Sequence, residues 1–136
     1  METSTSFIAR SLYRRLWRAC GPAVNKATAP TRALRKSVRD SFRETREVSD
    51  PVTREMLLER GENTARFLYS AAHTGSREHQ LTHNIAAMTM FRRGYAGRPP
   101  VKHKLNKEQQ ALHDDVYAAF ERTLAAVNES HNLSLR

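Results

Sequence analysis

Residues 8–18, IARSLYRRLWR, place an apolar row beside a row of arginines, and this pairing decides the predicted fold. Ile8, Leu12 and Leu16 recur every four residues, the spacing that brings side chains onto one face of an α-helix. The arginines that recur at the same interval on a neighbouring face are Arg10, Arg14 and Arg18. We therefore predict a helix over about residues 5–20, stopped by Gly21-Pro22.

The same design recurs over about residues 30–47, where a proline at position 30 suits a first helical turn. The apolar row of this second helix consists of Leu34, Val38 and Phe42. The arginines alongside it are Arg35, Arg39, Arg43 and, three residues further on, Arg46. Two consecutive helices thus carry a buried edge next to a cationic edge.

The rest of the chain predicts three more helices. Ser49-Asp50-Pro51 is a helix start, and the helix that follows reaches about His73, although Gly61 weakens its middle. A fourth helix follows a 73–76 linker and ends at Gly94, and a fifth begins after Asn106 with a frayed tail after Glu129. The apolar row of the fifth consists of Leu112, Val116, Phe120, Leu124 and Val127. No strand-like alternation of useful length appears, so the predicted fold class is all-α.

Length and composition limit the class of protein. A chain of 136 residues suits one domain, and its 39% apolar content is enough for a modest core. No apolar run approaches the roughly 18 residues that a membrane span needs, so we expect no integral membrane protein. The single cysteine, Cys20, excludes an internal disulfide framework and a four-cysteine zinc site.

The sequence offers no recognisable catalytic or metal site. It lacks a glycine-rich phosphate loop, a serine nucleophile elbow and a carboxylate pair within an apolar segment. His79 and His83 share a helical face, but no third ligand follows at the spacing of a zinc site, and surface histidines are the more common case. We therefore expect no enzyme, no bound metal and no directly bound cofactor.

Positive charge is concentrated in two acid-free regions of a chain whose net charge is +9. The first covers residues 3–39, and the second surrounds an irregular basic loop expected over about residues 94–105. Such a loop, with an aromatic side chain available to stack, suits RNA phosphates. The possible RNA contacts are Arg92, Arg93, Tyr95, Arg98, Lys102 and Lys104.

The first twenty residues have the composition of a mitochondrial presequence. They are rich in Ser, Thr and Arg, carry one acidic residue at Glu2, and are amphipathic when helical. Targeting to the mitochondrial matrix is therefore expected. Cleavage stays an open alternative, because the same helix carries an apolar row that the rest of the bundle can bury.

Three short motifs in order resemble the LYR motif family of small mitochondrial helical proteins. They are Leu12-Tyr13-Arg14, Val38-Arg39-Asp40-Ser41-Phe42-Arg43 and Ser49-Asp50-Pro51. The resemblance covers about residues 7–72. It implies a three-helix core over residues 1–73, with residues 74–136 forming a helical extension.

The resemblance also implies an activity. Members of the family bind the mitochondrial acyl carrier protein, whose acyl chain enters the helical core on the partner's 4'-phosphopantetheine arm. The implied carrier contacts are Leu12, Tyr13, Arg14, Arg10, Arg18, Arg35, Arg39, Arg43 and Arg46. The implied wall of the acyl channel is Leu16, Leu34, Val38, Phe42, Leu57 and Leu68. On amphipathic helices such arginine rows are often only solvated faces, but here no acidic residue compensates them.

Residues 54–68 are most similar to the family member associated with assembly of the mitochondrial ribosome. The resemblance therefore favours a non-enzymatic adaptor that docks acylated carrier protein on a ribosomal particle. Two alternatives stay open. One is an assembly factor or accessory subunit of a respiratory complex or of the iron-sulfur machinery. The other is a basic helical RNA-binding ribosomal protein that binds no carrier.

Overall fold

The computed structural model describes residues 2–97 and 107–135, and this part of the chain is helical without any strand. The prediction of an all-α fold is therefore confirmed. The five helices are α1 (Glu2–Ala23), α2 (Thr28–Glu44), α3 (Pro51–Ala71), α4 (Arg77–Gly97) and α5 (Lys107–His131). None of the described helices is long and apolar enough to cross a bilayer.

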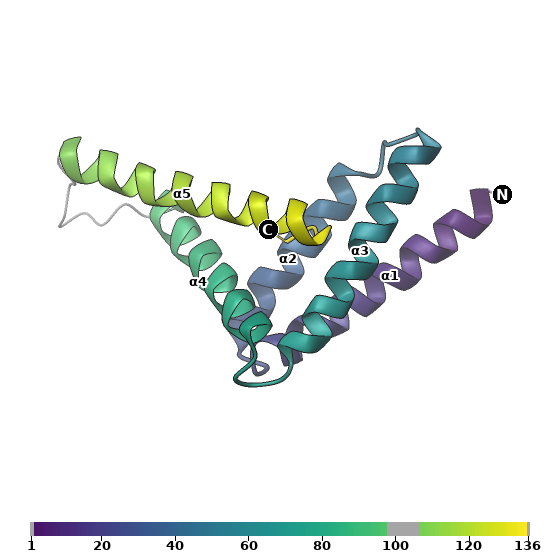
Figure 1. The fold of residues 1–136 in the computed structure, drawn as a ribbon, viewed down its shortest axis with the longest axis horizontal. Coiled ribbons are helices and arrows are strands. Elements are labelled where there is room, and N and C mark those ends of the chain that lie inside the picture. Colours follow the sequence, from purple (N-terminus) through teal and green to yellow (C-terminus); the bar gives the residue numbers. More distant parts are fainter. Residues whose placement is uncertain (1, 98–106, 136) are drawn as a thin grey trace.

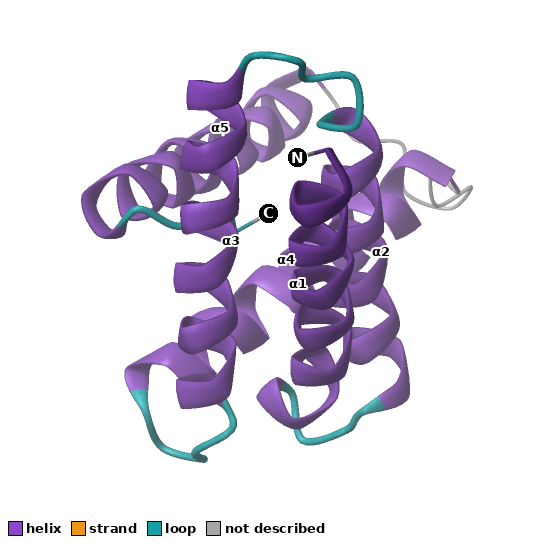
Figure 2. Ribbon diagram, turned by 90° about the vertical axis from the view of Figure 1, so that its right-hand side faces the viewer, coloured by secondary structure: helices purple, strands orange, loops and turns teal. Residues whose placement is uncertain are grey.

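The first three helices form an up-down-up bundle, in which α1 packs against both α3 and α2 (Figures 1 and 2). α4 leaves the lower end of this bundle at an angle but still packs against α2 and α3. α5 then returns across the open side between α4 and the bundle, so that the end of the chain reaches α3 (Figure 1). The N-terminal turn of α1 lies at the same end of the bundle as the α2–α3 connection (Figure 2).

One buried cluster joins α1, α2, α3 and α4. Its α1 members include Leu12, Leu16 and Cys20, whereas Ile8 of the predicted row is 45% exposed. α4 contributes Ala86 to the same cluster, so a helix from the expected extension completes the core of the first three helices. The full set of buried members is Leu12, Leu16, Ala19, Cys20, Ala23, Val24, Leu34, Ala65, Leu68, Ala71 and Ala86.

The predicted stop of the first helix at Gly21-Pro22 is wrong, because α1 continues through both residues to Ala23. A proline in the last turn removes one backbone hydrogen bond and leaves few turns to disrupt. The chain turns at Asn25 and Lys26, whose φ values of 56° and 57° are left-handed. The Lys26 amide then donates to the Gly21 carbonyl at 2.8 Å, which closes the helix end.

α2 ends at Glu44, three residues before the predicted end, because the backbone tightens there. The Thr45 amide and hydroxyl both bond to the Ser41 carbonyl, and the Arg46 amide reaches only three residues back, to Arg43. The start of α3 is as predicted. The Asp50 carboxylate accepts from the Thr53 amide at 3.2 Å, and the same carboxylate bonds the Thr53 hydroxyl, which lowers the Asp50 pKa.

α3 passes through Gly61 without a break, and the glycine has a packing reason. A Cβ at position 61 would lie 2.6 Å from Cδ2 of Leu12, closer than carbon atoms approach without clashing. Gly61 therefore lets α1 and α3 come together at Leu12, which is 1% exposed. Glycine at this position lowers the intrinsic helix propensity of α3, but it allows the contact between α3 and Leu12 of α1.

Two predictions for the C-terminal half need correction. α4 continues to Gly97, past the predicted end at Gly94, so residues 94–97 of the expected basic loop are helical and the rest lies outside the described residues. The frayed tail after Glu129 is wrong, because α5 runs to His131 and is followed by an ordered segment. In that segment Leu133 and Leu135 are 4% and 7% exposed.

The apolar row of α5 is covered only in its second half. Phe120, Leu124 and Val127 pack against a second buried cluster that contains Ile85 and the two leucines of the final segment. Leu112 and Val116 in the first half are 65% and 53% exposed. The amphipathic pattern therefore predicts the helix correctly but not how much of its face is buried.

An ion pair between Arg15 and Glu62 joins α1 to α3. Arg15 Nη1 donates to Glu62 Oε2 at 2.9 Å, and Nη2 bonds the second carboxylate oxygen, which makes the contact bidentate. This bond lowers the pKa of Glu62 below its ordinary 4.5. About a third of each side chain is exposed, so we expect the pair to contribute less than about 1 kcal/mol.

Because the folded pKa of Glu62 is depressed, its contribution to stability is complete above about pH 4.5 and is lost as pH falls through the folded value. We predict that Glu62→Gln removes this part of the acid dependence, measured by urea denaturation between pH 3 and 7. Glu59→Gln, at an exposed carboxylate on the same helix, is the control. Identical pH profiles for both variants and the parent would contradict the role of the pair.

Candidate functional site

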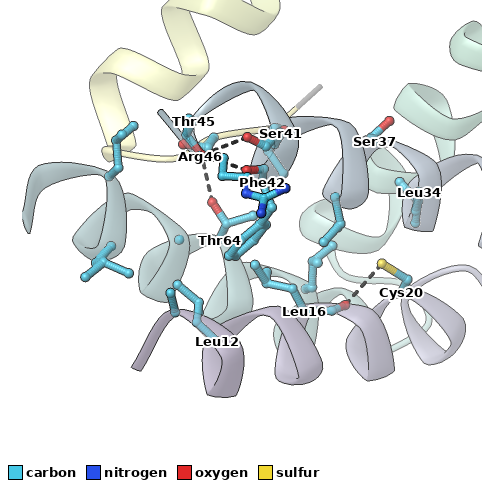
Figure 3. Close-up of a pocket in the computed structure, with 18 of the residues that line it drawn as sticks. Leu12, Leu16, Cys20, Leu34, Ser37, Ser41, Phe42, Thr45, Arg46 and Thr64 are labelled. Atoms are coloured by element: carbon cyan, nitrogen blue, oxygen red, sulfur yellow. Dashed lines mark hydrogen bonds between the residues drawn. The ribbon is translucent and has the colours of Figure 1, made fainter. Parts of the chain in front are cut away.

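A cavity of about 460 Å³ lies inside the helical bundle. Its volume is within the range of ligand sites in proteins, roughly 300–1,000 Å³. Leu12, Leu16 and Cys20 of α1 line one side, and Ser37, Ser41 and Phe42 of α2 face them (Figure 3). Further lining residues come from these two helices, from the connection between α2 and α3, from α3 and α4, and from the segment that follows α5.

The structure brings all six predicted channel residues into the wall of this one cavity. They are Leu16, Leu34, Val38, Phe42, Leu57 and Leu68. Leu16, Leu34 and Leu68 are buried, and the other three are partly exposed, which places them nearer the surface. Whether an acyl chain occupies the cavity stays a prediction.

The cavity opens at one end of the bundle. Most of its exposed lining residues come from the first turns of α1, from the connection between α2 and α3 and from the first turn of α3, and the α1 start and this connection lie together in Figure 2. Ser134, in the segment after α5, is a further exposed lining residue. The residues at this mouth are Thr5, Ser6, Thr45, Arg46, Val48 and Arg54. At the other end the lining is buried and includes Cys20, Thr82 and Ile85. The site is therefore an apolar pocket with a polar, cationic entrance.

Burial removes reactivity from the one thiol in the wall. Cys20 is fully buried and its Sγ–H donates to the Leu16 carbonyl at 3.1 Å. Loss of solvation raises its pKa to about 11, and the charge of Arg35 offsets only a small part of this shift. The thiol is neutral at physiological pH and acts as a small apolar wall group.

Tyr13 of the tripeptide supports the cavity wall from outside. Its ring meets that of Phe42 edge to face, with 5.1 Å between centroids, and lies 5.7 Å from that of Trp17. Arg35 closes this seam, because its Nε donates to the Trp17 carbonyl at 3.2 Å and its guanidinium lies 5.2 Å from the indole centroid. Tyr13 and Arg35 are thus partly engaged in joining α1 to α2.

The remaining arginines predicted to contact a carrier are exposed, and they fall into two groups. Arg10, Arg14 and Arg18 lie on α1, while Arg39 and Arg43 lie on α2. Arg46 differs from these because it also lines the cavity mouth. Leu12 of the tripeptide belongs to the cavity wall rather than to the exposed rim.

Sequence reasoning missed several residues of the site. One of them, Arg54 at the mouth, could have been found from the sequence, because it lies in the first helical turn after the Asp50 cap. In the structure its Nε donates to the Val48 carbonyl at 2.6 Å. Residues from the C-terminal half had no signal, because only tertiary packing brings them to the cavity. These are Thr82, Ile85, Ser134 and Leu135.

The predicted RNA contacts remain predictions. The side chains of three of them, on α4, lie outside the described part of the structure, and the other three positions fall within 98–106. They are Arg92, Arg93 and Tyr95, and then Arg98, Lys102 and Lys104.

As for metal sites, no group of three metal-ligating side chains occurs among the described residues. His79 Nδ1 bonds the Ala71 carbonyl at 2.7 Å, and its ring stacks on that of His83.

Comparison with known proteins gives one match. Residues 8–67 match the model of the family described as Complex 1 protein (LYR family), a stretch that covers most of α1, all of α2 and most of α3. The matched stretch contains the three motifs that carry the resemblance to the LYR family. No curated protein and no solved structure matches the chain.

A substitution at Gly61 tests whether the volume of the cavity can be reduced without changing the stability of the fold. In Gly61→Ala, we expect the new methyl to push Leu12 toward the cavity, while the gain in helix propensity of about 1 kcal/mol offsets the strain. Binding of a fluorescent fatty-acyl probe should therefore fall several-fold, with little change in the urea midpoint. The control is Ala65→Gly, which opens space in the same helix. Unchanged probe binding in a folded Gly61→Ala variant would contradict this geometry.

Proposed function

We propose that this chain, whose residues 8–67 match the LYR family, is a non-enzymatic mitochondrial adaptor that holds the acyl chain of acyl carrier protein. The observation that carries the proposal is the cavity, which is apolar inside and opens beside Arg46 and Arg54. Small mitochondrial adaptors and assembly factors are typical of this family. The assignment of acylated carrier protein as the ligand rests on the chemistry of the cavity wall and of its mouth.

The apolar wall supports an acyl chain as the ligand. Each methylene group moved from water into such a wall contributes about 0.8 kcal/mol. Burying ten methylenes therefore supplies about 8 kcal/mol, from which the cost of ordering the chain is subtracted. Leu16 and Leu68, which are both 4% exposed, supply the continuous apolar surface that this requires.

The cationic mouth supports a carrier protein as the source of that chain. A 4'-phosphopantetheine arm brings a phosphate to the entrance when its acyl end lies inside, and guanidinium groups bind phosphate bidentately. Arg46 and Arg54 line the mouth, and the exposed arginines of α1 and α2 extend the positive surface around it. An acidic carrier surface is attracted to a chain with net charge +9.

The expected client is a mitochondrial ribosomal particle, bound in the matrix through residues outside the cavity. The basic character of residues 92–104 supports an RNA-containing client. A respiratory complex or the iron-sulfur machinery is the second candidate and uses the same carrier site. Mass spectrometry of particles sedimented with the tagged protein distinguishes these clients, because their protein partners differ.

Filling the cavity tests the acyl proposal directly. We predict that Val38→Trp lowers affinity for acylated carrier protein at least tenfold without changing affinity for the carrier that lacks an acyl chain, measured by calorimetry. Val116→Trp is the matched control, since that valine is 53% exposed on α5. If acylated and unacylated carrier bind the parent equally, or neither binds at low salt, the proposed function is wrong. Steep salt dependence without acyl dependence would favour the basic RNA-binding alternative.

The cationic mouth has its own test. Arg46→Gln should weaken binding of acylated carrier protein by about ten- to a hundredfold, because a charge-assisted hydrogen bond contributes roughly 1.5–3 kcal/mol. Arg122→Gln makes the same charge change at an exposed position on α5 and serves as the control. The double variant Arg14→Gln and Arg39→Gln then tests the outer rows. Parent-like binding by the double variant at physiological salt means that these rows are only solvated faces.

A further inference from the structure

The segment after α5, residues 132–135, turns back onto α3 and reaches the cavity. Asn132 adopts a left-handed φ of 53°, and the Leu133 amide donates to the Asn128 carbonyl at 2.8 Å. This is the hydrogen bond that closes a Schellman motif at a helix end, with an asparagine in the left-handed position. The turn directs the following residues into the protein, where Ser134 and Leu135 line the cavity.

Hydrogen bonds from two helices hold this segment in place. The Asn128 side chain of α5 makes both bonds to the backbone of Leu135, each at 2.8 Å. From α3, Thr64 Oγ1 accepts from the Ser134 amide at 2.9 Å. Asn63 Nδ2 donates to the Asn132 carbonyl at 3.1 Å, and Arg60 Nε donates to the Asn132 side chain. Because the backbone of this segment is bonded from both α5 and α3, the backbone of Leu135 is held at the cavity wall.

The two leucines of the segment are both buried, but they differ in whether they line the cavity. Leu133 is 4% exposed and Leu135 is 7% exposed, and both belong to the cluster that contains Ile85. Of the two, Leu135 lines the cavity, and it does so together with Ile85, Leu68 and Thr64. A change at Leu135 therefore alters cavity capacity, whereas the same change at Leu133 alters packing alone.

On the basis of the proposed function, we propose that this segment supplies a wall of the acyl channel through Ser134 and Leu135 and determines which chain lengths the channel accepts, with Leu135 as the specificity residue. A rigid wall opposes longer chains, because every methylene beyond the available volume must stay in water or displace packed atoms. The segment belongs to the C-terminal half of the chain, so chain-length preference is set outside the region that matches the LYR family.

The test uses the full chain with carrier protein loaded with saturated chains that differ by two carbons. Leu135→Ala should shift the preferred chain to one about two carbons longer and raise affinity for that chain about tenfold, since each buried methylene contributes threefold to fourfold in affinity. Leu133→Ala is the matched control and should lower the urea midpoint without moving the preference. Circular dichroism verifies the helical content of both variants.

Leu135→Phe provides the opposite change and keeps the proposal testable if the alanine variant does not fold. It fills the cavity from the same wall and should shift the preference toward shorter chains. The proposal is overturned if folded position-135 variants keep the parent's preference, or if Leu133→Ala moves it equally. If the parent binds all carriers without regard to the acyl chain, the proposed function itself fails, which is a different outcome from an unchanged preference.

Discussion

The close approach of α1 to α3 is the constraint on which the rest of the structure depends. Gly61 shapes this contact, because it has no side chain at the point where Leu12 enters, and a Cβ there would lie 2.6 Å from Cδ2 of Leu12 and push that side chain toward the cavity. Leu12 is at once a core residue and part of the cavity wall, so the packing of these two helices also sets the shape of the site. The bidentate pair of Arg15 with Glu62 joins the same helices closer to solvent.

Helices α1 and α2 each carry an apolar row and a row of arginines on neighbouring faces. On α1 and α2 the apolar rows face a shared interior, and the arginines that neighbour them face solvent or the α1–α2 seam. Among the described residues that line the cavity, the charged ones are Arg46 and Arg54, which lie at the mouth. This arrangement suits a ligand with an apolar end and an anionic end, because each end meets a surface of matching chemistry.

The helices themselves were predictable, because their signals are local. Apolar spacing located all five, and Asp50-Pro51 predicted the start of α3 through capping and proline geometry. The errors fall at helix ends. Gly21-Pro22 suggested a stop that occurs at Asn25, and a frayed tail was expected where Asn132 forms a helix cap. In both places an asparagine in left-handed conformation ends the helix, and that signal was present in the sequence but weaker than glycine or proline.

The sequence by itself determined the all-α fold and the two arginine rows, because helical periodicity states which side chains share a face. The six apolar channel residues were implied by the resemblance to the LYR family, and only the structure shows that they line one cavity. Only the tertiary structure decided that the cavity also includes Ile85, Thr82 and Leu135, and that Tyr13 and Arg35 join α1 to α2. These residues meet across long stretches of chain, and the packing of one helix on another, rather than the periodicity of either, places them together.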